Sequence, residues 1–503
     1  MANDRTWDVA VIGAGLGGGT LGYELARRGR SVVFLERGNS QESPLNEGWW
    51  PADLTHHDGA AAQTFRHPLG CGTGGSSGIF GMVMERFRPE DFEPRRYAPD
   101  AGESTVPEAW PIGYADLEPY YLEAERLYRV HGSQDPLFPD NSQCLPPPPA
   151  TAKERLLLEA LADSGLHPYR FHYACERVPE CDTCPGKLCP RQCRNDSHRM
   201  CVVPAREKYG AELRSDYRVV RLEHSNRSVQ EVVGVREGQE IRIKARIVVL
   251  AANTFGSPLI LMRSGLANGS GMVGRNLMLH VSDSLLVKRR GVSPSRLRPL
   301  AEGMNHGIAV NDFYQIDGVK HGNVHAHPTG VSQAAVEAFL RLKYPRRASQ
   351  FPAAVRLAAW IGASIHAEKT YFATIVDDLP YGDNRVLPDP SNDDRMAYAY
   401  SIRDELRTRA KRLVNRFSGA IAGRCSVTAV GSSCQLNRSH ACGTLRFGND
   451  PRTSVLDPAN RAHEVDNLYA VDASFFPTSG GINPGLTIAA NALRVAGIID
   501  GQL

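Results

Sequence analysis

The sequence lacks any uninterrupted apolar run long enough to cross a membrane. A transmembrane helix needs about 18 or more apolar residues, and Arg or Gly interrupts the longest candidates in this chain. Residues 1–15 also lack the charged start, apolar segment and small-residue cleavage site of a secretory signal. We therefore expect a cytoplasmic protein without a membrane span.

An excess of positive charge is also missing. The 58 Lys and Arg residues nearly balance the 55 Asp and Glu residues, which leaves a net charge of +3. No basic block with interleaved aromatic side chains is present, so we expect no nucleic-acid partner.

The length of the chain, 503 residues of which 42% are hydrophobic, predicts two or three domains.

Cysteine is sparse except in one stretch. Six of the 11 cysteines fall between Cys175 and Cys201, with the spacing C-x5-C-x2-C-x4-C-x3-C-x7-C. Pro185, Gly186 and Pro190 disfavour a regular helix there and predict a tight loop. In a reducing compartment such clusters more often hold metal or perform redox chemistry than form disulfides. Thiolates bind iron-sulfur clusters and zinc alike, so the spacing leaves both open, beside disulfides and free thiols.

A glycine-rich turn near the start of the chain predicts a dinucleotide site. Gly13, Gly15 and Gly18 fill the pattern G-x-G-x-x-G, and Glu36 ends the second strand of the predicted βαβ unit. These glycines permit a tight turn, close approach of a pyrophosphate and close helix-strand packing. The carboxylate of Glu36 would accept hydrogen bonds from ribose hydroxyls and would repel the extra phosphate of NADP. The unit predicts FAD or NAD, with strands at residues 9–12 and 31–35 and a helix at 19–28.

Several later motifs follow in the order of a known family. They are a Gly-Gly-Ser-Ser turn at residues 74–77, Gly-Ser-Pro at 256–258, Gly-Arg-Asn at 274–276, His-x-x-Gly-Thr at 440–444, Asp-Ala-Ser at 472–474 and Asn-Pro at 483–484. Together they resemble the glucose-methanol-choline (GMC) oxidoreductase family over nearly the whole chain. The resemblance implies FAD and an α/β fold, with a discontinuous Rossmann-type FAD-binding domain and a substrate domain whose antiparallel sheet is backed by helices.

The resemblance also implies which residues bind FAD. Besides Gly13, Gly15, Gly18 and Glu36, the expected cofactor-binding residues are Gly74, Gly75, Ser76, Ser77, Val220, Asp472, Ala473, Asn483 and Pro484. Phe80 stands where many family members carry Asn, so one polar contact near the flavin is absent or comes from another residue. No His lies where some relatives attach flavin, which predicts noncovalent FAD.

The order of the motifs predicts the division of the chain. The FAD-binding domain takes residues 1–143, 206–280 and 431–503, the last part with the catalytic residues. Residues 144–205 form a linker and the cysteine-rich loop, and residues 281–430 form the substrate domain. Asp312, Asp377 and Asp378 in that domain could meet a cationic ligand, but carboxylates are mostly solvated, so we expect them at the surface.

The catalytic residues implied by the resemblance are His440 and Asn483. Family members pass a hydride from an alcohol carbon to flavin N5 while a base takes the hydroxyl proton. An imidazole suits that task because its ordinary pKa of about 6.5 lies near working pH. We expect His440 to accept the proton and Asn483 to orient the alcohol oxygen.

The cysteine loop is similar to the loop that holds an iron-sulfur cluster in some bacterial sugar dehydrogenases of the family. On that basis the expected ligands are Cys181, Cys184, Cys189 and Cys193, which bind an iron-sulfur cluster or, as the second choice, structural zinc. At subfamily level the chain looks like the flavin dehydrogenases of aminoglycoside biosynthesis. The expected activity is oxidation of a primary alcohol of a sugar or aminoglycoside to an aldehyde, with an external electron acceptor. The alternatives are a sugar or polyol oxidase that uses oxygen, a lyase with redox-silent FAD, and an electron-relay module.

Overall fold

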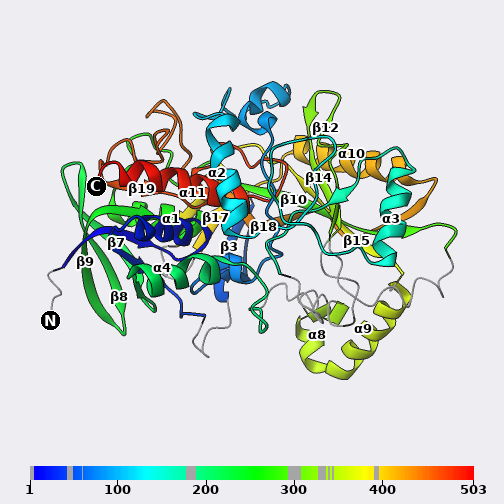
Figure 1. Cartoon of the computed structure of the whole chain (residues 1–503), viewed down its shortest axis with the longest axis horizontal. Coiled ribbons are helices and arrows are strands. Elements are labelled where there is room, and N and C mark those ends of the chain that lie inside the picture. The colour runs from blue at the N-terminus through cyan, green and yellow to red at the C-terminus, as the bar shows by residue number, and fades with distance from the viewer. Residues whose placement is uncertain are drawn as a thin grey trace.

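The structure is a computed structural model that describes residues 5–41, 49–58, 61–176, 188–292, 307–326, 345–366, 368–389 and 396–503, with a few single positions between 333 and 341. Two large sheets organise these residues, one rich in parallel pairs and one antiparallel. Figure 1 shows the first sheet with helices α1 and α11 on one half of the molecule, and the second sheet with α10 and α3 on the other half.

The first sheet has the strand order β6-β2-β1-β9-β8-β7, and β19 also pairs with β9. Strands β1, β2 and β9 are parallel and almost fully buried where they pair. Such continuous apolar strands are typical of a sheet covered on both faces. The bounds are β1 Thr6–Ile12, β2 Val32–Leu35, β6 Glu212–Arg214, β7 Arg218–Ser225, β8 Ser228–Arg236, β9 Gln239–Leu250 and β19 Leu468–Ala470.

Helices α1 (Leu16–Arg27), α11 (Gly485–Asp500) and α2 (Tyr114–Leu127) lie side by side in this half. Helix α11 contacts both α1 and α2, and nearly all of its residues are buried, including Leu486, Leu493 and Ile499. The predicted βαβ unit is therefore present. Its helix begins at Leu16 instead of residue 19, because Gly17, Gly18 and Gly19 are helical and pack closely against neighbouring elements.

The second sheet is antiparallel, with the order β18-β10-β15-β14-β11-β5. Helices α10 (Asp404–Ile421) and α3 (Ala152–Ala162) pack their apolar residues on it, which confirms the predicted sheet backed by helices. The bounds are β5 Tyr169–Arg170, β10 Met278–Arg289, β11 Ile308–Val310, β14 Gly322–Ala326, β15 Thr370–Val376 and β18 Cys425–Cys442.

The strands of the second sheet run across the predicted domain limits. Strand β10 begins before residue 281 and β18 ends after residue 431, while β5 comes from the predicted linker segment. The two halves therefore share continuous strands. The residue limits of the domains stay a prediction.

A third, smaller sheet joins distant parts of the chain in the order β16-β17-β3-β4. Its strands are β3 Trp49–Asp58, β4 Ala61–Gly70, β16 Arg385–Pro388 and β17 Met396–Ala399. The remaining elements are β12 Gln315–Ile316, β13 Val319–Lys320, α4 Val203–Tyr209, α5 Asn253–Ser264, α8 Pro345–Gln350, α9 Pro352–His366, a π-helical turn His198–Val202 and the 3-10 turns Gly75–Gly78, Pro89–Phe92, Pro94–Tyr97 and Ala473–Phe475. Of the helices in the described ranges, none is both long and apolar enough to cross a membrane.

Candidate active site

A large cavity opens where the parallel strands end. The space inside it, counted out to open solvent, is about 1610 Å³. Ligands bind at this edge in open α/β sheets because the strand-end loops diverge there. Of the residues predicted from the sequence, the lining includes Gly13, Gly15, Glu36, Gly75, Ser76, Ser77, His440, Asp472, Ala473, Asn483 and Pro484.

One end of the cavity, which we call the glycine end, is formed by the turns around Gly13, Gly15 and Gly75. Gly13 has a φ of 102°, and a Cβ atom there would lie 2.3 Å from the carbonyl oxygen of Ala251. A Cβ atom on Gly75 would lie 3.1 Å from Gly15 Cα. The two turns therefore approach each other as bare backbone.

Helix α1 starts in this bare turn without a side-chain cap. Its N-cap residue is Gly15, which has no side chain to accept from the first-turn amides. Unpaired N–H groups at a helix start attract anions, a pyrophosphate among them. The residues at the glycine end therefore fit the diphosphate of a dinucleotide.

Two predicted glycines lie behind the lining. A Cβ atom on Gly18 would come within 2.1 Å of Gly13 O and 2.8 Å of Ala251 Cβ, so Gly18 allows α1 to pack closely against the sheet. Gly74 has a φ of 92°, and its N–H donates to Ala14 O at 2.9 Å. This hydrogen bond connects the turn around Gly75 to the turn around Gly13.

Glu36 connects three loops at the glycine end. Its carboxylate accepts hydrogen bonds from the backbone N–H groups of Ala14 (2.8 Å), Gly38 (3.0 Å) and Gly72 (3.1 Å). Burial raises the pKa of Glu36, and these three donors oppose the rise. Glu36 also lines the cavity. Its predicted contact with a ribose stays a prediction.

Val220 does not lie in the cavity wall, whereas Val219 does. Strand β7 has a register shift between Val219 and Arg221, so Val220 is the extra residue of a bulge. Side chains alternate between the two faces of a strand, and Val219 is the buried one of this pair. The predicted contact of Val220 with FAD stays a prediction.

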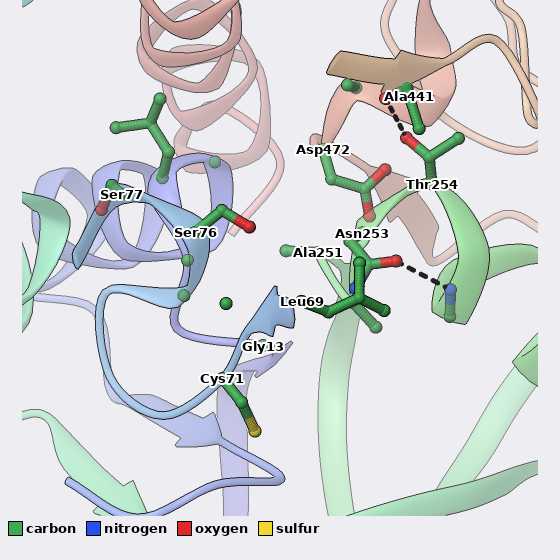
Figure 2. A pocket seen from close by; sticks show the side chains of 18 of the residues that line it. Gly13, Leu69, Cys71, Ser76, Ser77, Ala251, Asn253, Thr254, Ala441 and Asp472 are labelled. Carbon is green, nitrogen blue, oxygen red and sulfur yellow. Dashed lines mark hydrogen bonds between the residues drawn. The ribbon is translucent and has the colours of Figure 1, made fainter. Parts of the chain in front are cut away.

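Figure 2 shows the turn with Ser76 and Ser77 on one side of the cavity and Asn253, Thr254 and Asp472 on the other. Asp472 accepts a hydrogen bond from Ser257 Oγ and another from Ser474 N at 2.9 Å. Thr254 Oγ1 donates to Ala441 O at 2.7 Å. Helix α5 is thereby joined to β18 next to His440.

The other end of the cavity, which we call the histidine end, contains His440 from β18 and Asn483 from the turn before α11. Asn483 Nδ2 donates to His440 Nε2 at 3.2 Å. Burial, followed by the neighbouring His280 and His325, lowers the pKa of His440 well below its ordinary value. The imidazole is therefore neutral near pH 7. The structure brings the two predicted catalytic residues together.

A second histidine, which the sequence analysis did not single out, lies behind His440. His280 Nδ1 is 2.9 Å from His440 Nδ1, and His280 Nε2 is 2.8 Å from Gly480 O. Because burial lowers the pKa of His280, this ring is neutral and its single N–H donates to the Gly480 carbonyl. Its Nδ1 is then an acceptor.

The hydrogen bonds therefore assign the tautomer of His440. Its Nδ1–H donates to His280 and its Nε2 carries a lone pair beside Asn483. Asn437 Nδ2 lies 3.3 Å from the same Nδ1, a longer contact that does not decide the tautomer. His280 lies near the start of β10, and its contact with His440 follows from the pairing of β10 with β18, which no local pattern in the sequence indicates.

The expected metal ligands are only partly within the described residues. Cys181 and Cys184 lie outside them. Cys189 Sγ and Cys193 Sγ are 3.3 Å apart. Within the described ranges, no group of three or more His, Cys, Asp or Glu side chains is arranged to hold a metal ion. The four-cysteine ligand set stays a prediction.

The acidic residues of the second half are not at the surface as expected. Asp377 and Asp378 are each 1% exposed. Asp377 pairs with Lys320 at 3.0 Å, and Asp378 accepts from Leu279 N (2.8 Å) and Tyr400 OH (2.7 Å). Burial raises the pKa of Asp378 to about 8. The expectation of solvated carboxylates was wrong for Asp377 and Asp378, which directly follow β15 and are covered by neighbouring side chains. Asp312 is partly buried and pairs with His167 at 2.7 Å.

Comparison with known proteins agrees with this architecture. The family description "GMC oxidoreductase" matches residues 10–282 with its N-terminal part and residues 374–492 with its C-terminal part. The chain is 30% identical to 6'''-hydroxyparomomycin C oxidase of Streptomyces lividus, over 99% of this chain and 92% of the relative. It is 28% identical to paromamine 6'-oxidase of Streptomyces fradiae, over 100% and 92% of the two chains.

Among solved structures, pyridoxine 4-oxidase from Mesorbium loti superposes with a TM-score of 0.66 at 20% identity, covering 98% of this chain and 99% of that one. The fold and the cavity define a flavin-dependent oxidoreductase with a Rossmann-type FAD-binding part and a substrate part. The chain belongs to the GMC oxidoreductase family. It is an FAD enzyme that acts on CH–OH groups.

Proposed function

We propose that this enzyme oxidises a primary alcohol of an aminoglycoside or a related sugar to the aldehyde, with His440 as the base. The observation that carries the proposal is the pairing of His440 Nε2 with Asn483 Nδ2, 3.2 Å apart in the wall of the cavity that contains the glycine turns. The ring is held through Nδ1 by His280, and the lone pair of Nε2, which accepts from the Asn483 amide, lies in the cavity wall.

The residues of the cavity fit FAD. The bare backbone of Gly13, Gly15 and Gly75 leaves room for a diphosphate beside the start of α1. Helix α11 begins at Gly485 directly after Asn483 and Pro484, so a second helix N-terminus faces the cavity. Bound FAD would supply the acceptor of the hydride, at flavin N5.

His440 would take the hydroxyl proton of the alcohol on Nε2. Its pKa is lowered by burial, so the ring is deprotonated over the whole neutral range and ready to accept. The proton adds to Nε2 while the C–H bond of the carbinol carbon loses its electron pair. The Nδ1–H bond to His280 keeps the lone pair on the nitrogen that faces the cavity.

Asn483 would orient the alcohol oxygen. Its Oδ1 is buried and has no hydrogen-bond partner within the described residues, although its Nδ2 is bound to His440. A buried amide oxygen without a partner is costly, and a substrate hydroxyl can supply the missing hydrogen bond. The substrate hydroxyl and the His440 imidazole would thus both be hydrogen-bonded to the side-chain amide of Asn483.

The substrate class rests on the relatives. Two proteins that this chain matches over nearly its full length, at 30% and 28% identity, carry the names of oxidases of hydroxyparomomycin C and paromamine. A third, at 27% identity over 99% of this chain, is named 2-methyl-1,2-propanediol dehydrogenase. The names favour a hydroxyl-rich small molecule and include both oxidases and dehydrogenases.

Anaerobic reduction of the bound flavin tests the proposal. The holoenzyme is mixed with paromamine, neamine, glucose and choline under nitrogen, and bleaching of the flavin absorbance is followed by stopped flow. We expect fast bleaching with the aminoglycosides and slow or no bleaching with glucose and choline. Bleaching by glucose or choline alone would remove the aminoglycoside assignment, and bleaching by no alcohol would favour a redox-silent flavin.

Turnover of the same holoenzyme in air tests whether oxygen is the electron acceptor. We infer a dehydrogenase, because an iron-sulfur cluster on the predicted cysteine ligands would relay single electrons to an external partner. Turnover in air should then produce little hydrogen peroxide, whereas stoichiometric peroxide identifies an oxidase.

Metal analysis with electron paramagnetic resonance of anaerobically purified protein tests the loop itself. Iron with inorganic sulfide supports the predicted cluster. Zinc alone, or no metal, contradicts the relay. The described pair, Cys189 and Cys193, has its sulfur atoms 3.3 Å apart, closer than the separation of about 3.8 Å between two thiolates on a tetrahedral zinc.

A further inference from the structure

Helix α9 (Pro352–His366) presents its large apolar side chains to solvent. Leu357 is 58% exposed, Trp360 57%, Ile361 44% and Ile365 57%, and Phe351 before the helix is 61% exposed. The spacing 357, 360, 361, 365 places these four side chains on one face of an α-helix. Figure 1 shows α8 and α9 at one edge of the molecule, away from the layer of α1 and α11.

The opposite face of α9 carries the small residues and packs on the protein. Ala359 is fully buried, and a Cβ atom on Gly362 would lie 3.2 Å from Val336 Cγ1. This arrangement is the reverse of an ordinary surface helix, which buries its large apolar residues and exposes polar ones. A contiguous exposed apolar face of this kind marks a docking surface.

The charge of α9 and of the residues before it is mainly positive. Between residues 338 and 366 the sequence contains no Asp or Glu, and its charged residues are Arg341, Lys343, Arg346, Arg347 and Arg356. Glu337, just before this range, pairs with Arg341 at 2.6 Å. Arg347 and Arg356 are exposed. An apolar face with Trp and Ile beside basic residues is the pattern of helices that lie in the surface of an anionic membrane.

The length of α9 fits a helix that lies in a membrane surface and does not cross it. Its 15 residues extend about 22 Å, whereas the hydrocarbon core of a bilayer is about 30 Å thick. We propose that α9 docks the enzyme on an anionic lipid bilayer, with Leu357, Trp360, Ile361 and Ile365 in the acyl boundary and the arginines at the headgroups.

A second copy of this chain is a poorer occupant of the same face. In a two-fold symmetric contact the same surface meets itself, so the exposed Arg347 and Arg356 of one copy would face those of the other. An anionic headgroup layer complements this charge instead. The surface of the bilayer also accommodates a single protruding helix without shape matching.

Co-sedimentation of the FAD-loaded full-length protein with vesicles tests the proposal. Vesicles of phosphatidylcholine with about 30% phosphatidylglycerol are compared with pure phosphatidylcholine vesicles, at low and high salt. We expect binding to the anionic vesicles, weaker binding to the neutral ones, and loss of binding as salt rises. The double variant Leu357→Ser with Trp360→Ser should lower the partition coefficient about tenfold or more.

Two further variants complete the test. Leu137→Ser changes another exposed large apolar residue, 40% exposed and outside α9, and should bind vesicles like the wild type. Arg347→Glu with Arg356→Glu should weaken binding to anionic vesicles and leave the residual binding to neutral vesicles unchanged. Flavin content and flavin reduction should stay normal in every variant, which shows that each is folded.

Three results would overturn the proposal. The first is a wild type that does not sediment with anionic vesicles. The second is an equal loss of binding in Leu137→Ser. The third is a wild type that is dimeric by light scattering and becomes monomeric in the Leu357→Ser, Trp360→Ser double variant, which would assign the face to self-association.

Discussion

The glycine end of the cavity is lined by backbone, whereas the histidine end is lined by side chains that hold one another by hydrogen bonds. Gly13, Gly15 and Gly75 leave no space for a Cβ atom or bring main chains into direct approach. At the other end, His440, His280 and Asn483 come from three separate segments and meet only through their ring nitrogens and an amide. The first end depends on the shape of the main chain, and the second on the protonation of a few atoms.

Because of this difference, substitutions at the two ends should affect different properties of the enzyme. Changes at the glycine end should remove the cofactor and with it the folded enzyme. Changes at the histidine end should leave the flavin bound and alter only its reduction.

Gly13→Ala should have the largest effect. The added Cβ atom would lie 2.3 Å from Ala251 O, a backbone atom that no rotamer change can move away. We expect loss of FAD from the purified protein and a fall of several degrees or more in the melting temperature. Gly29→Ala is the matched control, because Gly29 also has a positive φ, 88°, but nothing lies within 4 Å of its Cβ position. Flavin retention by Gly13→Ala would contradict the steric explanation.

His440→Ala should come next. Without the acceptor of the hydroxyl proton, the rate of anaerobic flavin reduction should fall about 10²- to 10⁴-fold, while the flavin spectrum and its stoichiometry stay those of the wild type. Stopped-flow absorbance measures both. An unchanged rate would show that another group accepts the proton.

His280→Phe should have a smaller effect on the same rate. Phe fills the space but offers no acceptor to His440 Nδ1–H, so the reacting tautomer is no longer favoured. We expect a slowing of about 10- to 100-fold, the size typical of losing a group that orients an imidazole. His280→Asn keeps an acceptor near the Nδ1 position and should restore most of the rate. Equal losses in both variants would indicate a packing role only.

The pH dependence of flavin reduction should be shallow in the neutral range. His440 accepts a proton only while it is deprotonated, and burial lowers its pKa well below the ordinary value. The rate should therefore stay constant as the pH falls through about 6.5, the ordinary imidazole value, and decline only at more acidic pH. A decline centred near 6.5 would show that burial does not control this group.

Asp378→Asn should have the smallest effect, on stability alone. Burial raises the pKa of Asp378 to about 8, so between about pH 4 and 8 the folded protein binds a proton that the unfolded chain releases. Stability from this group is therefore lost as the pH rises through that window. The Asn variant should show a flatter melting temperature against pH, higher than the wild type by about 2 °C or more at pH 9. Parallel curves for the two proteins would contradict the assigned pKa.

The same contrast explains what the sequence could predict. The βαβ unit follows from local patterns, apolar strands and glycines, and its elements lie within a few residues of where they were expected. The pairing of His440 with Asn483 was accessible through the resemblance to GMC enzymes. His280 was not, because its role depends on a contact between β10 and β18 that no local pattern encodes. The bulge at Val220, which places Val219 in the cavity wall, likewise depends on strand pairing.

The continuity of β10 and β18 has a consequence for substrate exchange. Both strands begin or end beside His280 and His440 and extend as one hydrogen-bonded ladder into the antiparallel sheet. A hinge between the two halves would have to break this ladder, so the halves cannot swing apart as lids do in two-domain enzymes. Substrate and product must pass through an entrance shaped by loops, while His280 and His440 keep their positions relative to each other.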